Sequence, residues 1–252
     1  MQRITVVKVG GNEIDDPTFL AGLSSAVAAF AGPIVLVHGG GREISAALDR
    51  EQLPVSFIEG LRVTSPEAMA IMQQVVCGTI NKRVVARLLA AGVRAIGLSG
   101  IDLALLRCHP YRPNGADLGR VGIVTDVDQL AIRAMLNQGW LPVFAPVALG
   151  LEDGLSYNIN ADMVAQAIAA ALEGAELLFI SNVSGVILND QVVPELDVAA
   201  TDAAIARGAI SGGMVPKVRA ALQALAAGAY SARITNLAGF HTGGTRFIRQ
   251  GA

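Results

Sequence analysis

The sequence of 252 residues is poor in several features that mark whole classes of protein. Its two cysteines, Cys77 and Cys108, form neither a metal-ligand spacing nor a disulfide framework. No segment reaches the ~18 uninterrupted apolar residues of a membrane-spanning helix. The formal net charge of −2 leaves no basic surface for nucleic acid. We therefore expect a protein that binds neither membranes nor nucleic acid and holds no metal ion through its own side chains.

Signals for secretion and for a hydrolytic active site are also missing. The chain enters an apolar, strand-like run at once, without the charged and apolar regions of a signal peptide, so we expect a cytoplasmic protein. His38, His109 and His241 are scattered, and no Ser-His-Asp or Cys-His arrangement can be recognised. His38 ends an expected strand, and we interpret it as a hydrogen-bonded structural residue rather than a catalytic one.

Lysine is scarce, and the positions of the few lysines suggest a binding site. Of the 19 basic residues only Lys8, Lys82 and Lys217 are lysines. Lys8 and Lys217 lie in glycine-flanked segments, next to residues 10–11 and 212–213 respectively. Where arginine supplies most positive charge, a retained lysine suggests a need for a compact ammonium group. Glycine beside it suits a phosphate, which accepts bonds from close backbone N–H groups. Chance survival is the alternative, chiefly for Lys82 on an expected helix.

Short β-branched runs alternate along the chain with longer alanine- and leucine-rich stretches. The expected strands cover residues 4–9, 34–38, 93–98, 141–145, 177–180, 232–235 and 245–248. The expected helices cover residues 17–30, 42–50, 66–91, 127–138, 161–172 and 214–227, with Asp16 as a cap of the first. Polar segments at 54–64 and 101–124 suggest hairpins.

The expected strands are apolar throughout, which indicates burial on both faces and hence a mostly parallel sheet. The sequence therefore predicts a three-layer α/β/α sandwich, with 52% apolar residues to fill its core. We expect two lobes, residues 1–173 and residues 174–252. The boundary is placed near Glu173 and Gly174, after which we expect no further polar hairpins.

Glycine-rich segments follow the first two strands, at the sheet edge where ligands of parallel α/β proteins gather. Lys8 precedes Gly10 and Gly11, and the second strand runs into Gly39, Gly40 and Gly41 at a helix start. Consecutive glycines there leave room for an anion and offer it N–H donors. A tight turn is the alternative. Neither segment fits a P-loop or a dinucleotide fingerprint.

Two further segments carry candidate binding groups. Arg62, in the hairpin at residues 60–64, could grip a carboxylate in bidentate fashion, or it could be exposed on a hairpin edge. Asn160 could cap the helix that follows it, with Asp162 in the first helical turn. Asp162 could also lie between the two glycine-flanked lysines and orient both, because two ammonium groups aimed at one phosphoryl group repel each other.

These segments occur in the order found in the N-acetylglutamate kinases, and the chain resembles this branch of the amino acid kinase family over essentially its whole length. The matching segments are residues 8–11, 37–41, 60–64, 158–162 and 213–217. Gly-Leu-Arg-Val-Thr at 60–64 is the most specific, because carbamate, aspartate and uridylate kinases do not carry it in that form. The resemblance implies the amino acid kinase fold and an ATP-dependent phosphorylation of the side-chain carboxylate of N-acetyl-L-glutamate, which yields N-acetyl-L-glutamyl 5-phosphate for arginine biosynthesis.

The resemblance also implies roles for individual residues. The expected catalytic residues are Lys8, Lys217 and Asp162. The expected substrate-binding residues are Gly40, Gly41, Arg62 and Asn158, with Arg62 on the α-carboxylate. The expected phosphate-binding residues are Gly10, Gly11 and Asn160. The expected ATP-binding residues are Asn182, Val183, Ser184, Gly185, Ile210 and Ser211, and Mg²⁺ would arrive with the nucleotide. A carboxylate is already ionised at neutral pH, so the chemistry needs positioning and charge neutralisation rather than a general base.

The chain departs from the family pattern in one place. Many members carry aspartate where this chain has Asn182. That change, together with residues 77–83, also resembles kinases that phosphorylate aminoadipate or glutamate attached to an acidic carrier protein. Arg42, Arg83 and Arg87 could attract such a carrier, or could form an ordinary solvated helix face. A non-catalytic sensor of an amino acid or nucleotide is the third reading, although such a protein would not need Lys8, Asp162 and a second lysine together.

The oligomeric state is expected from the same resemblance. Hexameric, arginine-inhibited members carry an extra N-terminal helix, whereas this chain begins at the first strand. We therefore expect an arginine-insensitive homodimer of a small-molecule enzyme. The apolar face of the long helix at 66–91 is the expected interface.

Overall fold

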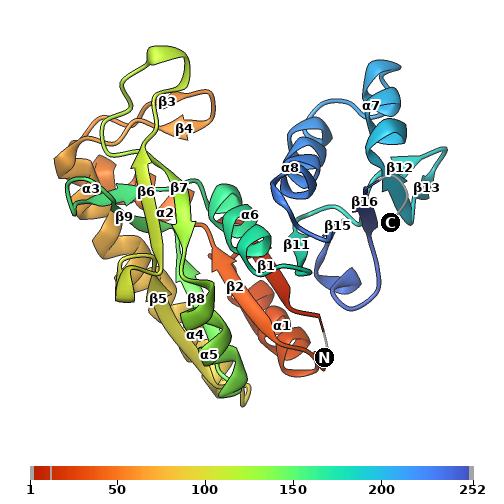
Figure 1. Ribbon diagram of the computed structural model, residues 1–252, viewed down its shortest axis with the longest axis horizontal. Helices are drawn as coiled ribbons and strands as arrows, with labels where there is room; N and C mark the ends of the chain where they lie inside the picture. The colour runs from red at the N-terminus through yellow and green to blue at the C-terminus, as the bar shows by residue number, and fades with distance from the viewer. Residues whose placement is uncertain (1–2, 12, 250–252) are drawn as a thin grey trace.

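The computed structural model describes residues 3–11 and 13–249, and a twisted eight-stranded sheet forms its centre (Figure 1). The strands lie in the order β14-β16-β15-β11-β1-β2-β8-β5. Their bounds are β1 (Thr5–Val9), β2 (Ile34–His38), β5 (Ala95–Ser99), β8 (Leu141–Ala145), β11 (Glu176–Ile180), β14 (Glu195–Asp197), β15 (Ser231–Thr235) and β16 (Thr245–Ile248). Only β14 and β16, parallel to each other, run against the rest. The predicted mostly parallel sheet is confirmed.

Helices cover both faces of this sheet, which completes the predicted three layers. On one face lie α1 (Pro17–Ala28) and α4 (Asn81–Ala90), and on the other lie α5 (Gln129–Asn137), α6 (Ala161–Ala171) and α8 (Met214–Ala227). The alternation of side chains along a strand supplies both cores. In β1, Val6 belongs to the α6 side, whereas Val7 and Val9 belong to the α1 side.

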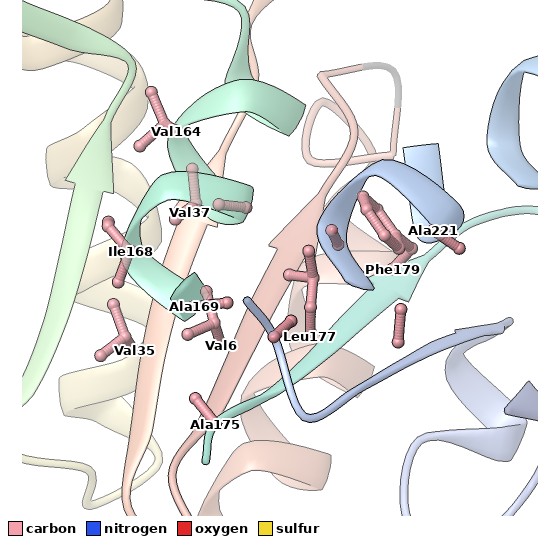
Figure 2. Packing of buried hydrophobic residues seen from close by; sticks show 14 of the residues in the cluster. Val6, Val35, Val37, Val164, Ile168, Ala169, Ala175, Leu177, Phe179 and Ala221 are labelled. Carbon is pink, nitrogen blue, oxygen red and sulfur yellow. The ribbon is translucent and has the colours of Figure 1, made fainter. Parts of the chain in front are cut away.

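The larger core is held together by α6. In Figure 2, Val164 and Ile168 of α6 lie over Val6 of β1 and over Val35 and Val37 of β2. All five side chains have an exposed fraction of 0%. Because α6 is anchored on the two strands that carry the glycine turns, the start of α6 is fixed relative to those turns.

Helix starts follow the local chemistry that the sequence suggests. The Asp16 side chain accepts a bond from Thr18 N at 2.8 Å, which confirms the predicted cap of α1. The Ser65 hydroxyl accepts from Ala68 N at 3.1 Å and begins α3 (Pro66–Gln73), where Pro66 costs no hydrogen bond.

The long helix predicted at 66–91 is present, but its middle is not α-helical. α3 continues into a π-helical segment, Gln74–Ile80, and then into α4. Along this long helix the apolar side chains of Met72, Val76 and Ile80 are 0–1% exposed and pack inside the chain itself. These three side chains therefore cannot contact another subunit, whereas Leu89 on the same long helix is 52% exposed, and the predicted use of this helix as a subunit interface stays a prediction.

A second, smaller sheet lies beside the first, above the carboxyl ends of its strands (Figure 1). It has the order β10-β9-β6-β7, where the β6–β7 pair is an antiparallel hairpin of the kind predicted. Its bounds are β6 (Leu106–Pro110), β7 (Gly122–Val127), β9 (Val147–Gly150) and β10 (Ser156–Asn158). β9 and β10 have no counterpart in the sequence-based prediction, because they are short and follow β8 directly.

The remaining elements are small. They are α2 (Gly41–Arg50), the hairpin of β3 (Phe57–Ile58) and β4 (Leu61–Arg62), the hairpin of β12 (Ile187–Leu188) and β13 (Gln191–Val192), α7 (Val198–Ala206), and single 3₁₀ turns at Asp102–Ala104, Pro113–Gly115 and Leu237–Gly239. The β12–β13 hairpin contradicts our statement that polar hairpins stop at residue 173. α7 was also not predicted.

The two predicted lobes share one sheet. β11 follows the proposed boundary and pairs with β1 on one side and β15 on the other. Figure 1 shows the later elements, from α7 to β16, gathered at the end of the molecule away from β5. No helix in the described ranges has the length and apolar character to cross a bilayer.

Candidate active site

The carboxyl ends of β1, β2 and β11 lie side by side at the centre of the sheet. In the register, Val9 is opposite His38 on one side and Ile180 on the other. Adjacent strands are separated by about 4.8 Å. The turns that begin at Gly10, Gly39 and Ser181 therefore start from one small region, although more than 140 residues of sequence separate the last from the first two.

The first two turns touch through their backbones. Gly39 N donates to Val9 O at 3.0 Å. A Cβ atom on Gly11 would lie 2.6 Å from Gly40 N and 2.7 Å from Gly41 N, which is too close for any side chain. By contrast, a Cβ atom on Gly41 would meet nothing within 4 Å. The glycines thus allow a close backbone approach at Gly11 and leave open space beside the first turn of α2, as an anion needs.

Lys8 and Asp162 form an ion pair in this region. The Lys8 ammonium lies 2.8 Å from Asp162 Oδ1, with side-chain exposures of 18% and 35%. Asp162 is in the first turn of α6, where Asn160 Oδ1 accepts from Asp162 N at 2.8 Å and from Met163 N at 3.4 Å. Asn160 therefore caps α6, as predicted. Its other predicted role, phosphate binding, stays a prediction. Its amide nitrogen has no partner in the described part of the chain.

Arg62 is held against the triple-glycine turn. Its Nη2 donates to Gly41 O at 2.9 Å and to Ser45 Oγ at 2.8 Å, and its guanidinium lies 4.7 Å from the centre of the Phe57 ring. Burial lowers the pKa of Arg62, and the residue is only 7% exposed. The alternative of an arginine exposed on the hairpin edge is wrong. Within the described residues, the buried Nη1 has no hydrogen-bond partner.

Asn158 joins the same group of residues from the second sheet. Its Nδ2 donates to Thr64 Oγ1 at 3.1 Å, and that hydroxyl donates to Arg62 O at 2.8 Å. The end of β10 is thereby tied to the β3–β4 hairpin. Ser45 and Thr64 were not singled out from the sequence as site residues. A serine one turn into the helix after the glycines and a threonine two positions after the arginine gave no distinguishing signal there.

His38 is a structural residue, as interpreted from the sequence. Its side chain is fully buried, and desolvation by burial lowers its pKa to about 4, so the ring is neutral at physiological pH. Nδ1 lies 2.8 Å from Gly39 O, and Nε2 lies 3.1 Å from the side-chain nitrogen of Asn81.

Lys217 takes a different partner from Lys8. Its ammonium donates to Asn182 Oδ1 at 3.0 Å. No ion pair joins Lys217 to Asp162 in the described ranges, so the arrangement with Asp162 wedged between both lysines is not the one observed. Asn182 follows β11 and Lys217 lies at the start of α8, whereas Asp162 lies in the first turn of α6 and pairs with Lys8 of β1.

The residues predicted to bind ATP lie on the β11–β12 connection and just before α8. Val183 and Ile210 both pack into the larger core, which brings these two segments to one cluster. Gly185 has a φ of +142°, and a Cβ there would lie 2.7 Å from Val192 Cγ1. Ser184 is half-buried and Ser211 is exposed. A loop that needs glycine and a helix start beside Lys217 can together hold phosphate groups.

Arginines near α2 are already paired with acids. Arg42 Nε lies 2.9 Å from Asp15 Oδ2, and Arg83 makes an ion pair and a second hydrogen bond, of 3.0 Å, with Glu43. These bonds lower the pKa of Glu43, so its carboxylate stays charged. Arg42 and Arg83 thus have acidic partners within the chain, whereas Arg87 is exposed, and the suggested attraction of an acidic carrier protein stays a prediction.

Fold and site together define a class of protein. An α/β/α sandwich that presents ammonium groups, glycine amides and a buried arginine at one sheet edge belongs to the enzymes that bind small anions and transfer phosphoryl groups. The chain belongs to the amino acid kinase family, whose model matches residues 3–236. The class predicted from the sequence is thus confirmed.

Named relatives agree with this assignment. The acetylglutamate kinase of Chloroflexus aggregans is 64% identical over 252 residues, which cover 100% of this chain and 99% of the relative. That of Chloroflexus aurantiacus is 65% identical over 247 residues, 98% and 97% of the two chains. Among solved structures, smu.665 from Streptococcus mutans UA159 has a TM-score of 0.79 at 29% identity and covers 98% of this chain and 99% of its own. The resemblance seen in the sequence is confirmed.

Proposed function

We propose that this chain is an acetylglutamate kinase that transfers the γ-phosphoryl group of ATP to the side-chain carboxylate of N-acetyl-L-glutamate. The observation that carries the proposal is Arg62, buried against the triple-glycine turn with Nη1 lacking a partner among the described residues. A guanidinium in this state suits a substrate carboxylate, which can accept two parallel bonds. The named relatives support the same reaction.

The substrate has two carboxylates, and the site offers two kinds of positive group. Arg62 would bind the α-carboxylate, because its planar fork is fixed by Gly41 O and Ser45 Oγ. Asn158, tied to Thr64, would bind near the acetamido group. The side-chain carboxylate would then face the glycine turns and Lys8. This placement holds the nucleophile by both ends before the reaction begins.

The chemical step needs no proton transfer. A carboxylate oxygen of the substrate forms a bond to the γ-phosphorus, and the bond from that phosphorus to the bridging oxygen of ADP breaks. Negative charge grows on the leaving oxygen and stays on the three oxygens in transfer. Lys8, oriented by Asp162, would neutralise that charge from one side, and the amides of Gly11 and Gly40 would donate to it. Lys217, held by Asn182, would do so from the nucleotide side.

We also propose a division of labour between the lobes. Residues 1–173 would bind the acyl substrate, and residues 174–252 would bind ATP through Asn182 to Gly185 and through Ile210 and Ser211. Within the described residues no group of three histidines, cysteines or acids could hold a metal ion. Mg²⁺ would arrive with the nucleotide phosphates and shield their charge. We propose a homodimer in the cytoplasm, with an interface that excludes the buried face of Gln74–Ile80.

Trapping the acyl phosphate tests the proposal directly. The protein is given ATP, Mg²⁺ and hydroxylamine with free N-acetylglutamate, free glutamate or N-acetylaminoadipate in turn, and the hydroxamate is measured. We expect product only from N-acetylglutamate. Arg62→Met is the matched variant, and it should lose most of the product at low substrate concentration. Formation of product only with carrier-bound substrate would support the carrier-dependent kinase, and binding without any product would support the sensor.

A further inference from the structure

Asn81 lies behind the triple-glycine turn and bonds to several elements at once. It begins α4, directly after the π-helical segment, and is 1% exposed. Its side-chain nitrogen lies 2.9 Å from Val143 O of β8 and 3.1 Å from His38 Nε2 of β2. Its side-chain oxygen lies 3.1 Å from the Lys82 ammonium. The proposed reaction uses none of these groups.

The surroundings fix which way the Asn81 amide points. A backbone carbonyl only accepts hydrogen bonds, so the atom near Val143 O must be the NH₂ group. An ammonium only donates, so the atom near Lys82 must be the oxygen. Two acceptors remain for the second amide hydrogen, and His38 Nε2 at 3.1 Å is nearer than Leu98 O at 3.5 Å, so this hydrogen is directed at Nε2, which accepts it. His38 therefore carries its proton on Nδ1.

The proton on Nδ1 holds the first peptide of the glycine turn. Nδ1–H donates to Gly39 O at 2.8 Å. In a trans peptide the C=O of one residue and the N–H of the next point in opposite directions. Fixing the Gly39 carbonyl therefore fixes the direction of the Gly40 N–H. Gly40 N lies 2.6 Å from where a Cβ of Gly11 would be, so this amide is at the contact of the two glycine turns.

We propose that Asn81, with Lys82 behind it, is a positioning residue that sets the tautomer of His38 and thereby aims the Gly40 amide at the transferring phosphoryl group. The inference rests on the proposed function, because it gives a purpose to that amide. It also accounts for the one lysine that the sequence left unexplained.

Gly97 in β5 belongs to the same arrangement. The Lys82 ammonium donates to Gly97 O at 3.0 Å as well as to Asn81. A Cβ on Gly97 would lie 2.1 Å from Asn81 Oδ1 and 2.8 Å from Lys82 Nζ. Absence of a side chain at Gly97 is thus required for Asn81 and Lys82 to occupy these positions.

The tautomer can be observed without any turnover. The chain has three histidines, so ¹⁵N-histidine labelling gives few ring signals, and the shifts of Nδ1 and Nε2 distinguish the two neutral forms. We expect His38 in the wild-type protein to be neutral with the proton on Nδ1 from pH 6 to 8.5. A wild-type His38 with its proton on Nε2 would overturn the proposal, whatever any variant does.

Asn81→Asp tests the consequence for catalysis. A carboxylate cannot donate, so His38 must place a proton on Nε2. The new carboxylate raises the pKa of His38, whereas burial and the nearby cations Lys82 and Arg83 lower it. The comparison is therefore made at pH 8.5, where we expect the ring to be neutral and Nδ1 to be bare against Gly39 O. We expect kcat to fall at least about 10-fold, by analogy with loss of an aligned donor, with KM for N-acetylglutamate within about threefold. As pH falls and His38 gains its second proton, the deficit relative to wild type should shrink.

The matched control is Asn137→Asp, which makes the same change at an exposed position at the end of α5. It should leave kcat and the ring signals unchanged. An Asn81→Asp protein that keeps the Nδ1–H form, or that has wild-type kcat at pH 8.5, overturns the proposal. Wild-type protein that makes no acyl phosphate overturns the proposed function instead, and the ring signals still test the hydrogen-bond arrangement.

Discussion

The two halves of the candidate site are built differently. On the proposed acyl-substrate side, Lys8, Arg62 and His38 are buried or half-buried, and each contacts a residue of another element: Asp162, Gly41 and Asn81 respectively. On the proposed nucleotide side, Asn182 and Ser211 are exposed, and Lys217 makes one bond to Asn182. The glycines at residues 11 and 213 show the same contrast, since a Cβ would be blocked by backbone at the first and meet nothing within 4 Å at the second.

This difference shows which side chains of the candidate site are held in place before any ligand binds. The acyl substrate is small, so few contacts hold it and each must be placed in advance. A nucleotide brings a large surface and several charges, so it can be held by an open loop and a helix start. We therefore expect substitutions on the acyl side to affect both folding and catalysis, and substitutions on the nucleotide side to affect catalysis alone.

The largest effects should come from the two lysines. Lys8→Arg and Lys217→Arg should each lower kcat about 100-fold or more, because a planar guanidinium cannot replace a compact ammonium beside the transferring group. Only Lys8→Arg should also lower the melting temperature, since its partly buried pair with Asp162 is disturbed. Steady-state kinetics and thermal unfolding measure both.

Arg219→Lys, at an exposed position of α8, is the control for these variants and should behave as wild type. Near wild-type turnover of Lys8→Arg or Lys217→Arg would contradict the proposed role of that lysine in stabilising the transferring phosphoryl group. If both lysine variants lowered the melting temperature equally, the proposed difference in order between the two halves of the site would be wrong.

Arg62→Lys should be next in size. The lysine keeps the charge but loses the fork that Gly41 O and Ser45 Oγ hold in place. We expect KM for N-acetylglutamate to rise about 10- to 100-fold, or roughly 1.4–2.7 kcal/mol, with KM for ATP unchanged. The exposed Arg112→Lys is the control. A rise in KM for ATP instead would place Arg62 on the nucleotide side.

Gly11→Ala should destabilise the fold by about 1–3 kcal/mol, because the new Cβ meets the backbone of Gly40 and Gly41. The melting temperature should fall by roughly 2–4 °C per kcal/mol. Gly213→Ala, where the space is open, should leave it unchanged. A stable Gly11→Ala protein would show that the two turns can separate without cost.

Asn182→Asp should have the smallest effect. The carboxylate can accept the same bond from Lys217 and adds an exposed ion pair, worth about 0–1 kcal/mol. Because this carboxylate competes with phosphate for the ammonium, KM for ATP should rise less than about fivefold. Initial rates at varied ATP concentration measure the change, and a lower KM would show that this chain is impaired by its asparagine.

Strands and helices with strong local patterns were predicted closely. β2, β8, α8 and β16 have the bounds expected from the sequence, because each is a compact apolar run between clear turn residues. β9, β10 and α7 were missed, since they are short and carry weak patterns. The π-helical turn at Gln74–Ile80 was also missed, as nothing in its composition distinguishes it from an α-helix.

The sequence named candidate site residues, and the structure shows which of them contact one another. The structure unites Lys8 with Asp162 and places Arg62 beside Gly41, and these roles stay proposals until tested. Lys217 contacts Asn182 rather than Asp162 in this structure, and its expected role beside Asp162 stays a prediction. Sequence spacing shows which helices and strands carry these residues. The hydrogen-bond partner of each side chain depends on how those helices and strands pack, which the spacing does not show.

By itself the sequence determined the order of strands and helices, the apolar faces and the glycines that permit close approach, because these depend on neighbours along the chain. Only the tertiary structure decided that Gly11 meets Gly40, that Lys217 pairs with Asn182 and that Asn81 stands behind His38. These contacts join residues 29 to 43 positions apart. They exist because β1, β2 and β11 end at one edge and the helices that follow are fixed there by their buried faces.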